Sequence, residues 1–67
     1  MNSYGNRLRV LRKQRKESIT QAAQAIGISY QALQSYESET RVPRDAVKIL
    51  LANYYDCSVS DIFFRQL

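Results

Sequence analysis

The feature of this sequence that most constrains its fold is a pair of helix beginnings separated by a glycine. Residues 18–21 read Ser-Ile-Thr-Gln, a capping box in which the serine hydroxyl accepts a hydrogen bond from the third backbone N–H while the glutamine side chain reaches back. Gly27 suits the left-handed backbone that follows a helix, and Ser29 is the expected cap of the next helix. Because only Ile28 separates Gly27 from Ser29, we predict that the two helices cross at a steep angle.

Three other segments of the chain show helical patterns. Leu8 and Leu11 form the inward stripe of a helix over about residues 4–16. Another helix is expected to begin near Pro43, because proline suits the first helical position. A last helix is expected from residue 58, because residues 58–61 repeat the capping pattern.

No stretch of the chain alternates with the period of two that is typical of a half-buried strand. A chain of 67 residues has room for one small core and not for an enclosed active-site cavity. The sequence therefore predicts a single all-α domain over residues 1–67, a compact five-helix bundle in which the two crossed helices span about residues 18–37.

Residue counts exclude several classes of function. Cys57 is the only cysteine and the chain has no histidine, which excludes an internal disulfide, a zinc cluster and histidine-based catalysis. No nucleophile is paired with a base, so we expect no enzyme activity, no metal and no cofactor. The longest apolar run, residues 49–52, is far shorter than the roughly 20 residues of a membrane helix, and no signal peptide is visible. We therefore predict a cytoplasmic protein without membrane contacts.

Positive charge is concentrated at one end of the chain. Residues 1–16 contain six Arg and Lys residues and no acid, whereas residues 18–36 contain no charged side chain. The remainder, from residue 37 on, is nearly neutral. A cationic segment beside an uncharged, Gln- and Ser-rich centre indicates a binding module for nucleic acid.

The helix capped by Ser29 carries an uncharged polar row. At 100° per residue, Tyr30, Gln31, Gln34 and Ser35 share one arc, while Leu33 and Tyr36 lie on the other side and can pack. Amides and hydroxyls both donate and accept hydrogen bonds, so they can distinguish base edges. A solvated helix surface more often carries Glu, Lys and Arg, and the row therefore favours DNA readout. Gln31 is the leading candidate, since glutamine can bridge N6 and N7 of adenine.

These motifs, taken with their spacing, resemble the Xre family of helix-turn-helix regulators, which includes the lambdoid phage repressors and Cro proteins. The resemblance runs without a gap from Arg7 to Phe64. It rests on Arg7-Leu8, Leu11-Arg12, Ser18, Ala23, Ile26-Gly27-Ile28-Ser29, Tyr36-Glu37, Pro43, Val59 and Asp61-Ile62.

The resemblance implies a lambda repressor-like fold whose third helix lies in the major groove of double-stranded DNA. It also implies a scaffold salt bridge between Arg12 and Glu37. The base-contacting positions of the family fall on, or at the margin of, Ser29, Tyr30, Gln31, Gln34 and Ser35.

The sequence departs from the family at positions that bear on phosphate binding. Ile19 replaces a glutamine that clamps a phosphate, although backbone N–H groups at this helix start can still hold one. Glu39 and Asp56 replace glycines, and a left-handed backbone costs a side-chain-bearing residue about 1 kcal/mol or more. The carboxylate of Glu39 would also face phosphate. The expected phosphate contacts are Arg9, Ile19, Ser38, Arg41 and Arg44.

One such module rarely supplies enough specificity alone, so we expect a homodimer that reads an inverted repeat with half-sites about 34 Å apart. Such a dimer would repress transcription by occupying an operator. The length leaves no sensor domain, and we expect no small-molecule ligand. The C-terminal segment carries more large apolar groups than a small core easily buries, and the expected dimer interface is Tyr54, Tyr55, Phe63, Phe64 and Leu67.

Two other functions stay open at this point. The first is a protein-interaction module, such as an antitoxin that masks a partner protein through its C-terminal aromatic residues, and a regulatory protein partner is consistent with it. The second is a basic helix that binds anionic membrane or RNA. The second requires bulky apolar side chains beside the basic ones, and Leu8, Val10 and Leu11 are a small set.

Overall fold

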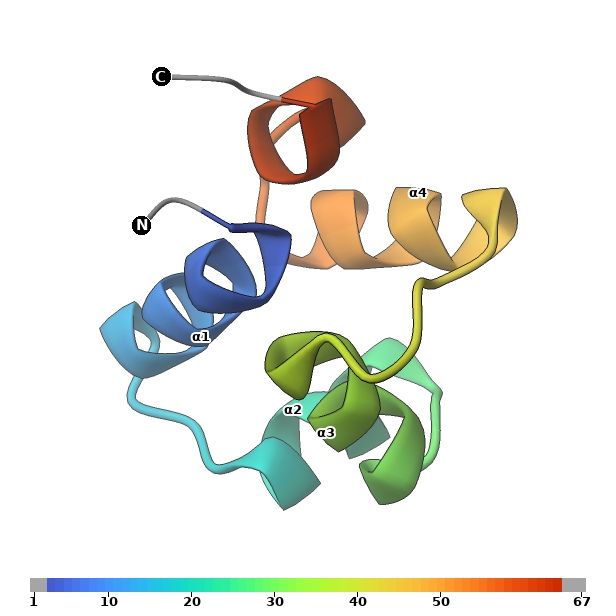
Figure 1. Ribbon diagram of the computed structural model, residues 1–67. Helices are drawn as coiled ribbons and strands as arrows, with labels where there is room; N and C mark the ends of the chain where they lie inside the picture. Colours follow the sequence, from blue (N-terminus) through green and yellow to red (C-terminus); the bar gives the residue numbers. More distant parts are fainter. Residues whose placement is uncertain (1–2, 65–67) are drawn as a thin grey trace.

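The computed structural model describes residues 3–64, and within this range the chain forms helices and connecting turns without a strand (Figure 1). The elements are α1 (Tyr4–Gln14), α2 (Ile19–Ile26), α3 (Tyr30–Ser38), α4 (Asp45–Tyr54) and η1 (Ser60–Phe64), the last being a short π-helix. The predicted all-α fold with five helical segments is confirmed.

Each of the first three helices has a serine cap. The caps of α2 and α3 are the ones that the sequence predicts. The Ser18 hydroxyl accepts from the Gln21 backbone N–H at 3.1 Å, and the Gln21 side chain accepts from the Ser18 N–H at 2.9 Å. Ser29 accepts from the Ala32 N–H at 3.0 Å, and Ser3 caps α1 in the same way. Gly27 has the left-handed backbone, with φ of 93°. Local side-chain chemistry therefore sets where α2 ends and α3 begins.

The last two segments differ in detail from the prediction. α4 begins near Pro43 as predicted, at Asp45, but the proline is not its first residue, because Arg44 has an extended backbone with ψ of 163° and Pro43 is buried ahead of the helix. The capping pair predicted at residues 58–61 is present, with Ser58 and Asp61 exchanging hydrogen bonds of 3.0 and 3.2 Å. It opens the single π-type turn of η1 and not a regular α-helix.

One hydrophobic core joins all five elements. Leu8, Leu33, Leu51 and Ile62 are completely buried and come from α1, α3, α4 and η1. α3 packs against both α1 and α2, and η1 packs against α1. The smaller and aromatic members of the core are Ala22, Ala23, Tyr36, Ala52 and Tyr55. Because α3 is held on its inner side by Leu33 and Tyr36, its opposite side is left at the surface.

The helices of the described range are short. Between residues 3 and 64 no helix combines the length and the apolar character needed to cross a bilayer.

Candidate nucleic-acid interface

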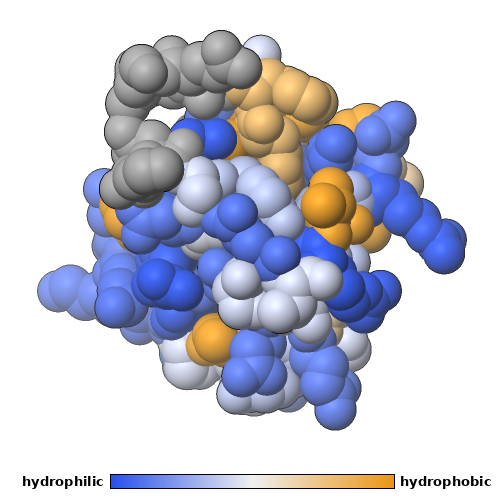
Figure 2. All heavy atoms as spheres, viewed as in Figure 1, coloured by the Kyte–Doolittle hydropathy of each residue, from blue (hydrophilic) through white to orange (hydrophobic). Residues whose placement is uncertain are grey.

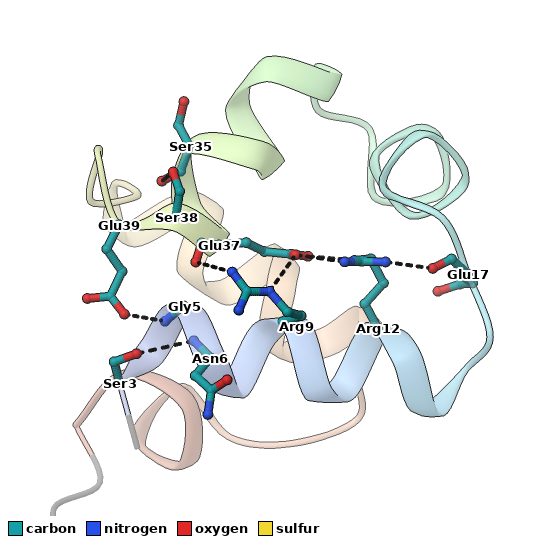
Figure 3. A network of polar contacts seen from close by, with 10 residues as sticks. All are labelled: Ser3, Gly5, Asn6, Arg9, Arg12, Glu17, Ser35, Glu37, Ser38 and Glu39. Carbon is teal, nitrogen blue, oxygen red and sulfur yellow. Dashed lines mark hydrogen bonds and ion pairs between the residues drawn. The ribbon is translucent and has the colours of Figure 1, made fainter. Parts of the chain in front are cut away.

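The outer side of α3 presents the predicted polar row to solvent. Ser29, Tyr30, Gln31 and Gln34 are exposed, and Ser35 is half-buried. Leu33 and Tyr36, on the inner side, are 0% and 6% exposed. In Figure 3 the Ser35 side chain points away from α1. The packing predicted for α3 is therefore confirmed, and the amide and phenol groups lie where a ligand can reach them.

The C-terminal end of α3 is closed by a left-handed residue that is not glycine. Glu39 has φ of 64° and Asp56 has φ of 57°, as predicted from the glycines they replace. The backbone N–H of Thr40 donates to the Ser35 carbonyl at 3.0 Å, and the Ser38 hydroxyl donates to the same carbonyl at 3.2 Å. These bonds fix the direction in which the chain leaves α3.

The Glu39 carboxylate is turned back onto α1. Its Oε2 accepts from the Gly5 backbone N–H at 3.1 Å, in the first turn of that helix (Figure 3). The positive N-terminal end of α1 attracts this carboxylate. The acidic side chain that follows the polar row is thereby held against α1.

Arg41 and Arg44 lie on the exposed loop between α3 and α4, on either side of the buried Pro43. The Tyr4 hydroxyl donates to the Arg41 carbonyl at 2.9 Å, which holds this loop against α1. The Arg41 guanidinium lies 5.9 Å from the centre of the Tyr36 ring. Both cations are thus carried by a loop whose backbone is fixed, next to the C-terminal end of α3.

The other three residues predicted to bind phosphate have different surroundings. Ser38 is exposed, and its hydroxyl is also 3.2 Å from that of Thr40. Ile19 is half-buried and packs against the core, so only its backbone could meet an anion. Arg9 donates to the Glu37 carbonyl at 3.4 Å and lies 3.9 Å from its carboxylate, while 44% of its side chain stays exposed. Arg9 therefore helps to hold α3 against α1 and also adds positive charge to the surface.

Arg12 and Glu37 form the predicted scaffold salt bridge. The guanidinium Nε and Nη2 donate to the two carboxylate oxygens at 2.8 and 3.0 Å, and Nη1 donates to the Glu17 carbonyl at 2.9 Å (Figure 3). Glu37 is only 4% exposed. The hydrogen bond to Glu37 raises the pKa of the Arg12 guanidinium above its ordinary value. This bidentate pair fixes the end of α3 to the last turn of α1.

One member of the predicted dimer interface is not at the surface. The expectation is wrong for Tyr55, whose ring is 6% exposed and belongs to the core. Tyr54 is half-buried, its hydroxyl donates to the Glu17 carboxylate, and the Arg15 guanidinium lies 4.4 Å above its ring. Both tyrosines make contacts within the chain, because the C-terminal end of α4 places them toward α1 and the segment that follows it.

The remaining members of that predicted interface have varied positions. Phe63 is half-buried, with its ring centre 5.5 Å from that of Tyr4. Phe64 is 62% exposed, and Leu67 lies outside the described residues. Ile49 and Leu50, which were not among the predicted site residues, are 52% and 45% exposed. The helical period could have indicated their exposure, because consecutive residues of a helix point in different directions and Leu51 takes the buried one.

Two short helices joined at a left-handed glycine, with the second packed on one side and polar on the other, define a helix-turn-helix protein of lambda repressor-like fold. The sequence profile of the helix-turn-helix family matches residues 8–62. The chain belongs to this Xre/Cro-like helix-turn-helix family.

Similarity to another protein supports the same assignment. The chain is 41% identical over 59 residues to an uncharacterised HTH-type transcriptional regulator, YobD, of Bacillus subtilis (strain 168). The match covers 88% of this chain and 53% of the relative, so the chain spans about half the length of the protein it resembles.

Proposed function

We propose that this protein binds double-stranded DNA in a sequence-specific way and regulates transcription, acting as a repressor that dimerises on an inverted repeat. The observation that carries the proposal is the row of uncharged hydrogen-bonding side chains on the outer side of α3. The row is supported from below by Leu33 and Tyr36 and is followed by the cationic loop of Arg41 and Arg44. Family membership supports a DNA-binding regulator and not an enzyme.

In the proposed complex α3 enters the major groove with its N-terminal half against the bases. Gln31 bridges N6 and N7 of an adenine, which supplies about 1–3 kcal/mol of discrimination. Ser29, Tyr30, Gln34 and Ser35 contact neighbouring bases or bridge to them through water. Because the Arg12–Glu37 pair and the packed inner side of α3 restrict its motion, the row is ordered before binding and little entropy is lost.

Phosphate contacts set the position of α3 on the duplex. Arg41 and Arg44 bind backbone phosphates from the fixed loop, and Arg9 and Ser38 add contacts at its edge. The backbone N–H groups at Ile19, the first residue of α2, hold a further phosphate. These contacts carry no sequence information but supply most of the salt-dependent affinity. A dimer that covers an operator in this way excludes polymerase by occupancy.

Selection from a randomised duplex library, followed by salt titration on the selected sequence, tests the proposal. Gln31→Ala is expected to relax the preference at one base pair. Arg44→Ala is expected to weaken all duplexes alike and to lower the salt slope by about one. Gln14→Ala, an exposed glutamine on α1, is the matched control and leaves both properties unchanged. Recovery of no enriched motif would contradict DNA readout and favour a protein-interaction module such as an antitoxin.

A further inference from the structure

The side of α3 that faces the proposed DNA site carries only neutral side chains. Tyr30, Gln31 and Gln34 are exposed there, and α3 contains neither arginine nor lysine. Its one acidic residue, Glu37, is 4% exposed and is paired with Arg12 in the interior. In Figure 2 the surface over α2 and α3, in the lower part of the view, is mostly pale or blue and shows little orange. Bases that meet this helix therefore meet amides and a phenol, and no charge.

Three arginines beside α3 are held at its C-terminal end. Arg12 donates from Nε and Nη2 to the Glu37 carboxylate at 2.8 and 3.0 Å, and its Nη1 donates to a backbone carbonyl at 2.9 Å. Arg9 donates to the Glu37 carbonyl at 3.4 Å, and Figure 3 shows both guanidinium groups pointing toward that residue. The Arg41 guanidinium lies 5.9 Å from the centre of the Tyr36 ring. These contacts keep the three cations away from the N-terminal half of α3.

A neutral row distinguishes base pairs in a particular way. In the major groove guanine presents two acceptors, O6 and N7, and is read by Arg or Lys, while the N4 donor of cytosine is read by a carboxylate. Adenine presents the N6 donor beside the N7 acceptor, which matches the carbonyl oxygen and the NH₂ group of one glutamine amide. Against guanine the same amide oxygen faces the O6 acceptor, so only one of the two hydrogen bonds can form.

The spacing of the row places its two amides on neighbouring base pairs. Gln31 and Gln34 are separated by a helical rise of about 4.5 Å, close to the distance of about 3.4 Å between stacked base pairs. Tyr30 precedes Gln31 and is 46% exposed, so its ring can contact the 5-methyl group of a thymine. The serines of the row discriminate less, because a hydroxyl both donates and accepts, and Ser29 already caps α3 through its oxygen.

We infer that the polar row selects A·T base pairs: Gln31 and Gln34 each bind N6 and N7 of an adenine in two adjacent pairs, and Tyr30 contacts a thymine methyl group beside them. The inference rests on the proposed function and specifies the class of duplex that this function requires. G·C pairs are disfavoured in this core because they place O6 of guanine against an amide oxygen. Arg41 and Arg44 bind phosphates and do not take part in this choice.

Selection by the full chain from a randomised duplex library tests the base composition first. Two adjacent A·T pairs are expected in each enriched half-site. Gln31→Ala is expected to lose the preference at one of them and Gln34→Ala at the other, each with about five- to a hundredfold weaker binding to the selected duplex. An enriched core of G·C pairs overturns A·T selection and leaves DNA readout standing. Recovery of no enriched motif overturns DNA readout, and A·T selection with it.

Base analogues test the individual contacts on the selected duplex. 7-Deazaadenine still pairs with thymine but lacks the N7 acceptor, so at the pair read by Gln31 it is expected to weaken wild-type binding about fivefold. Gln31→Ala should bind the two duplexes equally, because it has already lost the contact. Uracil in place of thymine removes the methyl group and should weaken the wild type about fourfold, but not Tyr30→Ser. Equal wild-type affinity for either analogue duplex overturns the contact that this analogue probes.

A change of preference is the strictest test of Gln31. Gln31→Arg places two donors where O6 and N7 of a guanine would lie, and it is expected to change the preferred pair at that position from A·T to G·C. Gln14→Arg is the matched control, because it adds the same charge at an exposed glutamine of α1 and should leave the preferred bases unchanged. Circular dichroism establishes that each variant is folded. A folded Gln31→Arg variant that still prefers A·T at that position overturns the assignment of Gln31.

Discussion

The guanidinium of Arg12 donates to both carboxylate oxygens of Glu37, at 2.8 and 3.0 Å, and so joins the last turn of α1 to the end of α3. Only 2% of the Glu37 side chain and 11% of the Arg12 side chain are exposed. A charge pair this well covered depends on both of its members, because either charge left alone would stay poorly hydrated.

Replacing Arg12 therefore destabilises the fold strongly. Arg12→Ala is expected to lower the free energy of unfolding by about 3 kcal/mol, since it leaves the Glu37 carboxylate buried without a partner. Urea denaturation measures the change. Lys13→Ala, which removes an exposed cation from the same helix, is the control and should have little effect. Similar losses in the two variants would contradict a special role for the buried pair.

Gly5 is required by close packing and not by its backbone angle. A Cβ atom at this position would collide with the Glu37 carbonyl oxygen and lie 2.7 Å from Cγ of Glu39. Because the carbonyl belongs to the backbone, Gly5→Ala is expected to cost about 2 to 3 kcal/mol of stability by thermal or urea unfolding. A Cβ atom at Gly27 would meet no atom within 4 Å. The stability cost of Gly27→Ala is therefore only the strain of the left-handed backbone, about 1 to 2 kcal/mol. A smaller loss for Gly5→Ala would show that α1 moves away from α3 at little cost.

Two left-handed residues differ in what their side chains do. Lys16 has φ of 58° and is exposed, and Lys16→Gly is expected to stabilise the protein by about 0.5 to 1 kcal/mol by removing backbone strain. Glu39→Gly relieves the same strain but also removes the bond to the Gly5 N–H, a capping contact worth about 1 kcal/mol. Its net effect should be close to zero. Equal gains in urea unfolding would mean that the Glu39 contact adds nothing.

Alkaline pH is expected to destabilise the protein through its buried tyrosines. Burial raises the pKa of Tyr55, and the hydrogen bond to Glu17 raises the pKa of Tyr54. A raised pKa in the folded state gives stability that is complete below the unfolded pKa, about 10, and is lost as pH rises through the folded value. Unfolding free energies measured at increasing pH should fall above about pH 10, together with the appearance of tyrosinate absorbance.

The variant Tyr55→Phe isolates one contribution to that alkaline loss. In the described part of the chain the Tyr55 hydroxyl is buried and makes no hydrogen bond. Its removal should leave stability near pH 7 unchanged or slightly higher and should make the alkaline loss less steep. Tyr30→Phe, at an exposed position on α3, is the control. A large loss of stability at pH 7 for Tyr55→Phe would contradict the absence of a partner.

Much of the helical framework follows from short-range signals in the sequence. The Ser18 capping box, Gly27 and the Ser29 cap lie within a few residues of the groups they bind, so the limits of α2 and α3 were predictable. The polar row of α3 was predictable for the same reason, because it depends only on helical spacing. That Pro43 lies ahead of the helix, and not in its first position, was not predictable from local signals, since the proline is buried and the helix begins at Asp45, after Arg44.

The sequence alone determined that this chain is a set of short capped helices with an uncharged polar row on the third one, because those features depend on neighbours along the chain. The tertiary structure decided which apolar side chains are interior: it buried Tyr55 and left Ile49 and Leu50 at the surface. It also decided that Glu39 binds Gly5, 34 residues away. Contacts between distant residues depend on how the helices are placed against one another, and no local pattern encodes that placement.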